Sequence, residues 1–247
     1  MGYNFDICGF QRAATYHSAQ DSSLLHKFMH MGKEICIGVL SDGCSGSVDD
    51  FHYRPELGAE WLVSEFAKTA KLFYEQGVRK HDLGQKIVLA ILNSMLNYQA
   101  QYPSSRWLQG KSHQYCEELV ATLYGFIADE ENLVLITSGD GFFFENNKVK
   151  YIPDDGIYPY KLMANSPKNQ WEKDLNSCFK ISLFPMDKLN IFGIASDGLK
   201  DMDRQIEKAL KNSNRNPEKI SWEITNIPDI PHFHDDITVI MLSVDKI

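Results

Sequence analysis

Short apolar runs that meet an aspartate recur along this chain. Three runs have the aspartate after them: Ile35 to Leu40 before Asp42, Leu133 to Ile136 before Asp140, and Ile191 to Ala195 before Asp197. In a fourth case the order is reversed, because Asp235 and Asp236 directly precede the run Ile237 to Leu242. Short continuous apolar runs bounded by turn residues are typical of buried strands. The pattern therefore predicts four buried strands, each with an aspartate at one end.

A hairpin is predicted around the first of these strands. Leu24 to Met31 has the pattern of a strand, and Gly32-Lys33 fits a tight loop into the strand that ends at Leu40. Asp21 falls just before the first strand of this hairpin, and Asp42 falls just after the second. The two ends of an antiparallel hairpin lie side by side. The sequence therefore predicts that Asp21 and Asp42 are neighbours.

Two long helices follow the hairpin. Pro55 to Gln76 carries one apolar stripe, and proline is well tolerated near a helix start. Gly77 is the expected stop of this helix, and Asp82 is the expected cap of a second helix that ends before Pro103. Each helix has a single apolar face, so the pair is suited to covering one face of a sheet.

The rest of the chain predicts short strands, one irregular segment and one more helix. We expect strands over Tyr3 to Gly9 (with a bend at Gly9), Leu119 to Ala128, Leu133 to Ser138, Gly141 to Glu145, Val149 to Ile152, Phe179 to Phe184, Asn190 to Ala195 and Ile237 to Val244. Those between Leu119 and Ile152 are expected to form one antiparallel meander. Residues 154–173 contain prolines and little periodicity, so an irregular segment is expected there, and Leu199 to Leu210 is the expected helix. This order predicts an α+β fold of mainly antiparallel sheets with helices on the outer faces, in one domain over residues 1–247.

Composition narrows the classes of function. The chain has 247 residues, 43% of them hydrophobic, and a net charge of −8, so a core is expected and a nucleic-acid partner is not. Five cysteines, an odd number without a C-x-x-C pair, indicate reduced thiols rather than a disulfide framework. Ile87 to Leu92 is the longest apolar stretch and is far too short to cross a bilayer. We expect a cytoplasmic protein, without a membrane or nucleic-acid partner, that is a monomer.

The strand-end aspartates are the candidate chemistry. A single Asp-Gly pair is explained by turn formation alone, because glycine tolerates positive φ and aspartate bonds its own backbone. Several carboxylates that converge on one place repel each other unless cations lie between them. A site made only of oxygen ligands suits Mg²⁺, Mn²⁺ or Ca²⁺. The sequence therefore predicts a metal site built from several aspartates.

These residues, taken in order, resemble a known family. The set consists of Gln20-Asp21, Asp42-Gly43-Cys44-Ser45-Gly46, Thr122, Gly139-Asp140-Gly141, Ser196-Asp197-Gly198 and Asp235-Asp236-Ile237-Thr238. It is similar to the metal-dependent protein phosphatases of type 2C, and most to their bacterial branch. The resemblance extends from about Gly9 to Val244. It implies a four-layer α-β-β-α sandwich, in which two mainly antiparallel sheets are flanked by helix pairs, with two Mn²⁺ or Mg²⁺ ions in the cleft.

The resemblance also assigns roles to the ligands. It implies that Asp42 bridges the two metals and that Gly43 offers its carbonyl oxygen. Asp197 and Asp235 would bind one metal, and Asp21 would hold the second through water. Asp140 would serve a third and weaker metal position, although a hairpin turn also explains Asp140 alone.

The activity implied is hydrolysis of phosphoserine or phosphothreonine in a phosphorylated protein substrate. Two divalent cations would lower the pKa of a shared water, which attacks phosphorus without a protein nucleophile. Asp42 and Asp197 would be the catalytic carboxylates, and Arg12 or His17 would bind the phosphate. Two positions depart from the family pattern: Gln20 stands where members carry glutamate, and Phe142 stands where they often carry arginine.

Two other functions are compatible with the same residues. The fold could be kept in a catalytically silent module that binds metal or phosphoprotein, which the changes at Gln20 and Phe142 favour. An unrelated structural protein stabilised by Ca²⁺ would also use several carboxylates. The ordered motif set favours the enzyme.

Overall fold

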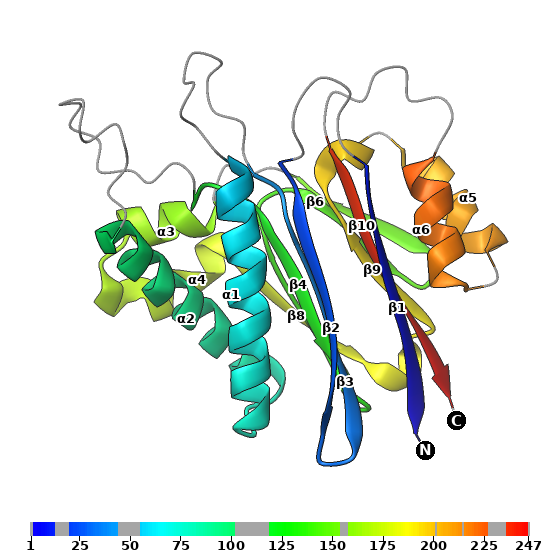
Figure 1. Cartoon of the computed structure of the whole chain (residues 1–247), viewed down its shortest axis with the longest axis horizontal. Coiled ribbons are helices and arrows are strands. Elements are labelled where there is room, and N and C mark those ends of the chain that lie inside the picture. The colour runs from blue at the N-terminus through cyan, green and yellow to red at the C-terminus, as the bar shows by residue number, and fades with distance from the viewer. Residues whose placement is uncertain are drawn as a thin grey trace.

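Two five-stranded sheets pack face to face, and helices cover both outer faces (Figure 1). The computed structural model describes residues 2–12, 20–43, 55–101, 119–153, 158–200, 202–213, 215–226 and 236–246. The first sheet has the order β2-β3-β4-β5-β8, and the second has the order β1-β10-β9-β6-β7. All of the pairings within both sheets are antiparallel. The predicted α+β four-layer sandwich is therefore confirmed.

The bounds of the elements are as follows. The strands are β1 Tyr3–Arg12, β2 Ser22–His30, β3 Lys33–Ser41, β4 Leu123–Ala128, β5 Asn132–Ser138, β6 Gly141–Glu145, β7 Lys148–Ile152, β8 Lys180–Pro185, β9 Ile191–Ala195 and β10 Ile237–Lys246. The helices on the first sheet are α1 Pro55–Glu75, α2 Lys80–Gln101, α3 Pro159–Asn165 and α4 Trp171–Cys178. Those on the second sheet are α5 Asp203–Asn212 and α6 Pro217–Thr225. Short 3₁₀ turns are η3 Lys168–Gln170, η4 Met186–Lys188 and η5 Asp197–Leu199.

The core has three layers, which follow from the side-chain pattern of the strands. Ile35, Ile37 and Val39 face helices α1 and α2, whereas Cys36 and Leu40, on the other face of β3, lie between the sheets. The third layer lies between the second sheet and helices α5 and α6. A strand that is buried on both faces has a continuous run of apolar residues in its sequence. For this reason β3, β4 and β5 can be recognised from the sequence. Among the described residues, no helix is long and apolar enough to cross a membrane.

The predicted meander is wrong in its topology. Strands β4 and β5 pair in the first sheet, but β6 and β7 belong to the second. The chain passes between the sheets through Gly139 and Asp140 alone, and it passes back through α3 and α4 before β8. Apolar periodicity identifies a strand but not the sheet that it joins, because strands of both sheets are buried. The consequence is that Asp140 lies at a crossing between layers and not in an ordinary hairpin.

Three local predictions also need correction. Residues 154–173 are not irregular throughout, since α3, η3 and the start of α4 lie there, and Pro159 occupies the first turn of α3, where proline costs nothing. Helix α5 begins at Asp203 instead of Leu199, and α6 was missed, although Asn216 caps it by accepting from the Lys219 N–H at 2.8 Å. Helix α2 begins at Lys80, so Asp82 lies in its first turn and is not its cap.

Two strand predictions also differ from the structure. Strand β1 does not bend at Gly9 but continues to Arg12. A Cβ atom at Gly9 would lie 3.4 Å from Leu25 Cδ1, which is an ordinary van der Waals contact between the two sheets. Strand β4 starts at Leu123, four residues later than expected from the apolar run.

Candidate metal centre

The β2–β3 hairpin brings the first two predicted ligands together. Ser22 pairs with Ser41 at the open end of this hairpin, so Asp21 and Asp42 are the next residues on each side. The Gly43 N–H donates to the Gln20 carbonyl at 3.3 Å, which extends the pairing past the strands. Asp21 and Asp42 therefore lie side by side at the open end of the hairpin.

Thr122, the residue directly before strand β4, holds the backbone of Asp42 from the other side. The Asp42 N–H donates to Thr122 Oγ1 at 2.9 Å, and the Thr122 N–H donates to the Asp42 carbonyl at 2.8 Å. Ser41 Oγ donates to the Thr122 carbonyl at 2.6 Å. Gly43 forms an isolated bridge with Ala121 just beyond. These bonds fix the peptide groups on both sides of Asp42, and therefore the direction in which its carboxylate leaves the chain.

Asp236 connects the second sheet to the first. Its Oδ2 atom accepts from the backbone N–H groups of Gln20 and of Asp21, the latter at 3.2 Å. Asp236 is 2% exposed and directly precedes β10. Asp236 therefore positions the start of β2, and with it Asp21.

Ser196 holds Asp197 beside the same strand. Its N–H donates to the Thr238 carbonyl at 3.0 Å, and its Oγ accepts from the Thr238 N–H at 2.9 Å. The same hydroxyl donates to the Asp236 carbonyl at 3.3 Å. Since Asp197 follows Ser196 and opens η5, its carboxylate leaves the chain at the sheet edge where Asp236 lies.

Asp21 is a buried carboxylate without a compensating charge. It is 6% exposed, and among the described residues neither of its oxygens has a partner in hydrogen-bond geometry. The pKa of Asp21 is raised to about 6, chiefly by burial and to a smaller extent by the negative charge of Asp236. Thr238, Asp42 and Ser196 lie near enough to lower that pKa in part. A buried carboxylate without hydrogen-bond partners destabilises the fold when it is ionised, unless a cation lies next to it. Asp21 and its neighbour Asp42 therefore fit a divalent cation.

Asp140 lies at the crossing between the sheets, half-buried, between two glycines of positive φ. Gly139 has φ +82° and Gly141 has φ +149°, values that L side chains rarely adopt. A Cβ atom on Gly139 would lie 2.8 Å from Thr122 Cγ2, and Thr122 is the residue that holds Asp42. The crossing therefore packs directly on the residue that positions the backbone of Asp42.

The remaining predicted residues lie at the edge of this site or outside the described residues. Arg12 is exposed and ends β1 opposite Ile237, which places it at the sheet edge next to Asp236. Asp235 and His17 fall outside the described residues. Within the described ranges, no three acidic, histidine or cysteine side chains gather as a complete cation site.

Sequence reasoning missed several residues that hold the site. Gln11 Nε2 donates to the Asp21 carbonyl at 2.8 Å, and the Tyr124 hydroxyl donates to the Gly139 carbonyl at 3.0 Å. The contact of Asp236 with the start of β2 is visible only in the structure, where its carboxylate accepts from the backbone N–H groups of Gln20 and Asp21. No sequence signal distinguishes Gln11 or Tyr124, because polar and aromatic residues at strand positions are common.

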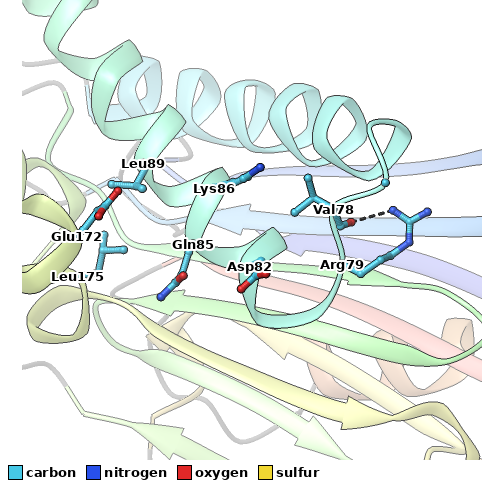
Figure 2. A pocket seen from close by; sticks show the side chains of 9 residues that line it. Val78, Arg79, Asp82, Gln85, Lys86, Leu89, Glu172 and Leu175 are labelled. Atoms are coloured by element: carbon cyan, nitrogen blue, oxygen red, sulfur yellow. Dashed lines mark hydrogen bonds between the residues drawn. The ribbon is translucent and has the colours of Figure 1, made fainter.

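A groove elsewhere on the molecule does not belong to this site. It has a volume of about 720 Å³ and lies at the turn between α1 and α2, at the C-terminal end of α1 (Figure 2). Arg79 and Lys86 face it together with Asp82 and Glu172, so it carries both signs of charge. Arg79 also donates to the Val78 carbonyl at 2.8 Å, as the dashed line in Figure 2 marks. This groove has no charge preference for a phosphate.

Comparison with known structures shows a shared fold. Serine/threonine phosphatase Stp1 from Staphylococcus aureus matches with a TM-score of 0.65 and 14% identity, over 100% of this chain and 97% of that chain. The catalytic domain of the phosphatase PstP in complex with two manganese ions gives 0.60 and 15%, over 99% and 100%. RsbX in complex with magnesium gives 0.56 and 16%, over 98% and 96%. At these identities the likeness establishes the fold.

The sequence itself supplies the family. No curated protein matches the chain. The family model described as protein phosphatase 2C matches residues 8–223, which include every predicted site residue except Asp235. Because this match covers most of the chain, the protein belongs to the protein phosphatase 2C family.

Proposed function

We propose that this protein hydrolyses phosphoserine or phosphothreonine in phosphorylated proteins, with Mn²⁺ or Mg²⁺ as cofactor. The observation that carries the proposal is the buried carboxylate of Asp21 beside Asp42, without a partner in hydrogen-bond geometry among the described residues. Membership of the protein phosphatase 2C family supports the same activity. The known structures with two manganese ions and with magnesium support the choice of metals.

In this proposal the ligands divide as the family resemblance implies. Asp42 would serve both cations and Gly43 would offer its carbonyl oxygen, Asp197 and Asp235 would serve one cation, and Asp21 would hold the other through water. When bound, such a cation pair lowers the pKa of a coordinated water and offsets the charge that develops on the phosphoryl oxygens. Asp42 and Asp197 are the catalytic carboxylates, since both hold the cations at the reacting atoms.

The other residues of the chain fix this arrangement in advance. Thr122 holds the backbone of Asp42, and Asp236 holds that of Asp21, so little reorganisation is needed when metal arrives. Arg12 is exposed at the same edge, where a guanidinium can bind a phosphate through two N–H groups. His17 is the alternative phosphate ligand.

The second candidate function is a catalytically silent module that binds metal or phosphoprotein. Gln20 favours it in sequence, because members of the family carry glutamate there. In this chain, however, Gln20 contributes through its backbone, which donates to Asp236 and accepts from the Gly43 N–H. That contribution is independent of the side chain, so the enzyme remains the stronger proposal.

The domain assignment over residues 1–247, the monomeric state and the cytoplasmic location stay predictions. So does the absence of a nucleic-acid partner. Size-exclusion chromatography with light scattering would measure the oligomeric state, and limited proteolysis would test whether the chain is one domain.

Removal of metal tests the proposed activity. We expect EDTA to abolish hydrolysis of p-nitrophenyl phosphate and of a phosphothreonine peptide, because the attacking water depends on the cations. Mn²⁺ added after the chelator is removed should restore the rate. Turnover that survives exhaustive chelation would contradict the proposal. Stoichiometric Mn²⁺ binding without turnover on either substrate would instead establish the silent module.

Replacement of Asp140 by alanine tests the third metal position. If Asp140 helps to hold a weakly bound cation, Asp140→Ala should keep two bound metals and lower kcat at least about tenfold. A residue that only forms a turn would cost under about 1 kcal/mol of stability and leave kcat unchanged. Metal counting by equilibrium dialysis, beside steady-state kinetics, separates the two results. The position of Asp140 at the sheet crossing favours the first.

A further inference from the structure

A buried tyrosine bonds to the turn that carries Asp140. Tyr124 lies in β4, is completely buried, and belongs with Leu40 and Phe126 to the apolar layer between the sheets. Its hydroxyl donates to the Gly139 carbonyl at 3.0 Å. A phenol hydroxyl in an apolar layer needs a partner, and here that partner is the main chain of the crossing.

The bonded carbonyl belongs to the peptide group that leads into Asp140. Strand β5 ends at Ser138 in the first sheet and β6 begins at Gly141 in the second, so only Gly139 and Asp140 span the distance between the layers. The carbonyl of Gly139 and the N–H of Asp140 lie in one rigid plane. A hydrogen bond to that carbonyl therefore orients the backbone from which the Asp140 side chain leaves.

The ring of Tyr124 also packs on the far side of the crossing. A Cβ atom at Gly141 would lie 3.0 Å from Tyr124 Cζ and 2.8 Å from the Ala195 carbonyl oxygen. Ala195 ends β9, just before Ser196 and Asp197. Tyr124 on one side and the end of β9 on the other thus hold the turn of Asp140 in register with Asp197.

We propose that Tyr124 is a positioning residue for Asp140. Through the Gly139 carbonyl it sets the direction of the Asp140 carboxylate, and so the affinity of the outer cation position. This inference rests on the proposed function, in which Asp140 serves a third divalent cation. Tyr124 itself is buried and touches neither metal nor substrate.

The substitution Tyr124→Phe removes the hydroxyl and keeps the ring. We expect two tightly bound Mn²⁺ ions to remain, while the Mn²⁺ concentration that half-fills the outer position rises about fivefold to tenfold, the factor expected for one lost hydrogen bond. Electron paramagnetic resonance measures the concentration of free Mn²⁺, and the bound Mn²⁺ is the difference from the total. This measurement does not depend on turnover. The Mn²⁺ dependence of kcat should shift by the same factor, and KM for the phosphopeptide should stay unchanged.

Tyr74→Phe is the matched control. Tyr74 is 3% exposed, and its hydroxyl donates to Asp129 Oδ2 at 2.8 Å near the C-terminal end of α1. This variant loses the same hydroxyl from a hydrogen bond of similar length, here to a carboxylate far from the site, and should leave Mn²⁺ binding unchanged. Equal Mn²⁺ curves for the two variants would overturn the proposal, because Tyr124 would then contribute only to general stability.

A double substitution tests whether Tyr124 acts through Asp140. In the Asp140→Ala background, Tyr124→Phe should have no further effect on kcat or on Mn²⁺ binding, since the carboxylate to be positioned is absent. A full additional loss in that background would refute the assignment. If the unchanged chain showed neither Mn²⁺ binding nor turnover, the proposed function would be overturned together with this inference. The unchanged chain is measured first, so this outcome is distinguished from a failure of the inference alone.

Discussion

Asp42→Ala is expected to lower kcat at least about a thousandfold, equivalent to about 4 kcal/mol of transition-state stabilisation. Asp42 is the one carboxylate proposed to bridge both cations, so its removal disturbs both at once. Asp197→Ala and Asp235→Ala should each cost a similar factor, because each removes a ligand of one cation. Steady-state kinetics at saturating Mn²⁺, together with a count of bound metal, measures the effect.

The fold should survive the substitution of Asp42. The bonds of this residue with Thr122 use backbone N–H and carbonyl groups, which alanine retains. Removing one negative charge from a site with several carboxylates also reduces the total repulsion in the metal-free protein. The thermal midpoint in EDTA should therefore be equal to or above that of the unchanged chain. Asp187→Ala, which removes an exposed carboxylate in η4, is the control and should change neither quantity. Turnover near the wild-type rate in Asp42→Ala would refute the two-metal assignment.

The helix pair and the β2–β3 hairpin could be predicted from sequence because their signals are local. An apolar stripe identifies α1, and Gly77, with φ +83°, ends it as expected. The hairpin turn has Met31 and Gly32 at positive φ, one residue earlier than the predicted Gly32-Lys33 loop. The register of the hairpin then follows, and it makes Asp21 and Asp42 neighbours as predicted. In these elements the residues that form the contacts are close to one another in the sequence.

The missed features depend on long-range contacts or on the exact place of a proline. The Gly139-Asp140 crossing is indistinguishable from a hairpin turn in sequence, since only the pairing partners of β6 reveal that it lies in the second sheet. Pro159 and Pro217 each stand at the first turn of a helix, where proline is favourable, but prolines in a polar stretch suggest breaks. The contact of Asp236 with the start of β2 joins residues 215 positions apart. No local pattern encodes such a contact.

Asp21→Asn is expected to have the largest effect on stability, and its sign should depend on metal. Burial raises the pKa of Asp21 from 3.8 to about 6. The folded chain therefore binds a proton at this group more tightly than the unfolded chain does. The contribution of Asp21 to stability is most favourable below the unfolded pKa and is lost as pH rises through the folded pKa. At neutral pH the metal-free protein carries a buried anion.

The size of this penalty follows from the shift of the pKa. A shift of about two units corresponds to about 3 kcal/mol at pH 7.5 and to about half of that at pH 5. Asparagine has nearly the same shape without the charge, so Asp21→Asn should raise the thermal midpoint of the metal-free protein by up to about 10 °C at the higher pH. The gain should shrink as the solution is acidified toward pH 5. Differential scanning calorimetry in EDTA at the two pH values measures both.

Mn²⁺ should reverse the order of the two proteins. A ligand that binds only the folded state stabilises it in proportion to the logarithm of its concentration over Kd, and Asp21→Asn weakens that binding by removing the charge that the second cation needs. The unchanged chain should therefore be the less stable of the two in EDTA and the more stable in saturating Mn²⁺. Asp187→Asn makes the same change of charge at an exposed position and should show no such crossing. If Asp21→Asn were destabilised by the same amount with and without Mn²⁺, Asp21 would be a structural carboxylate, and the cation that its burial calls for would have to lie elsewhere.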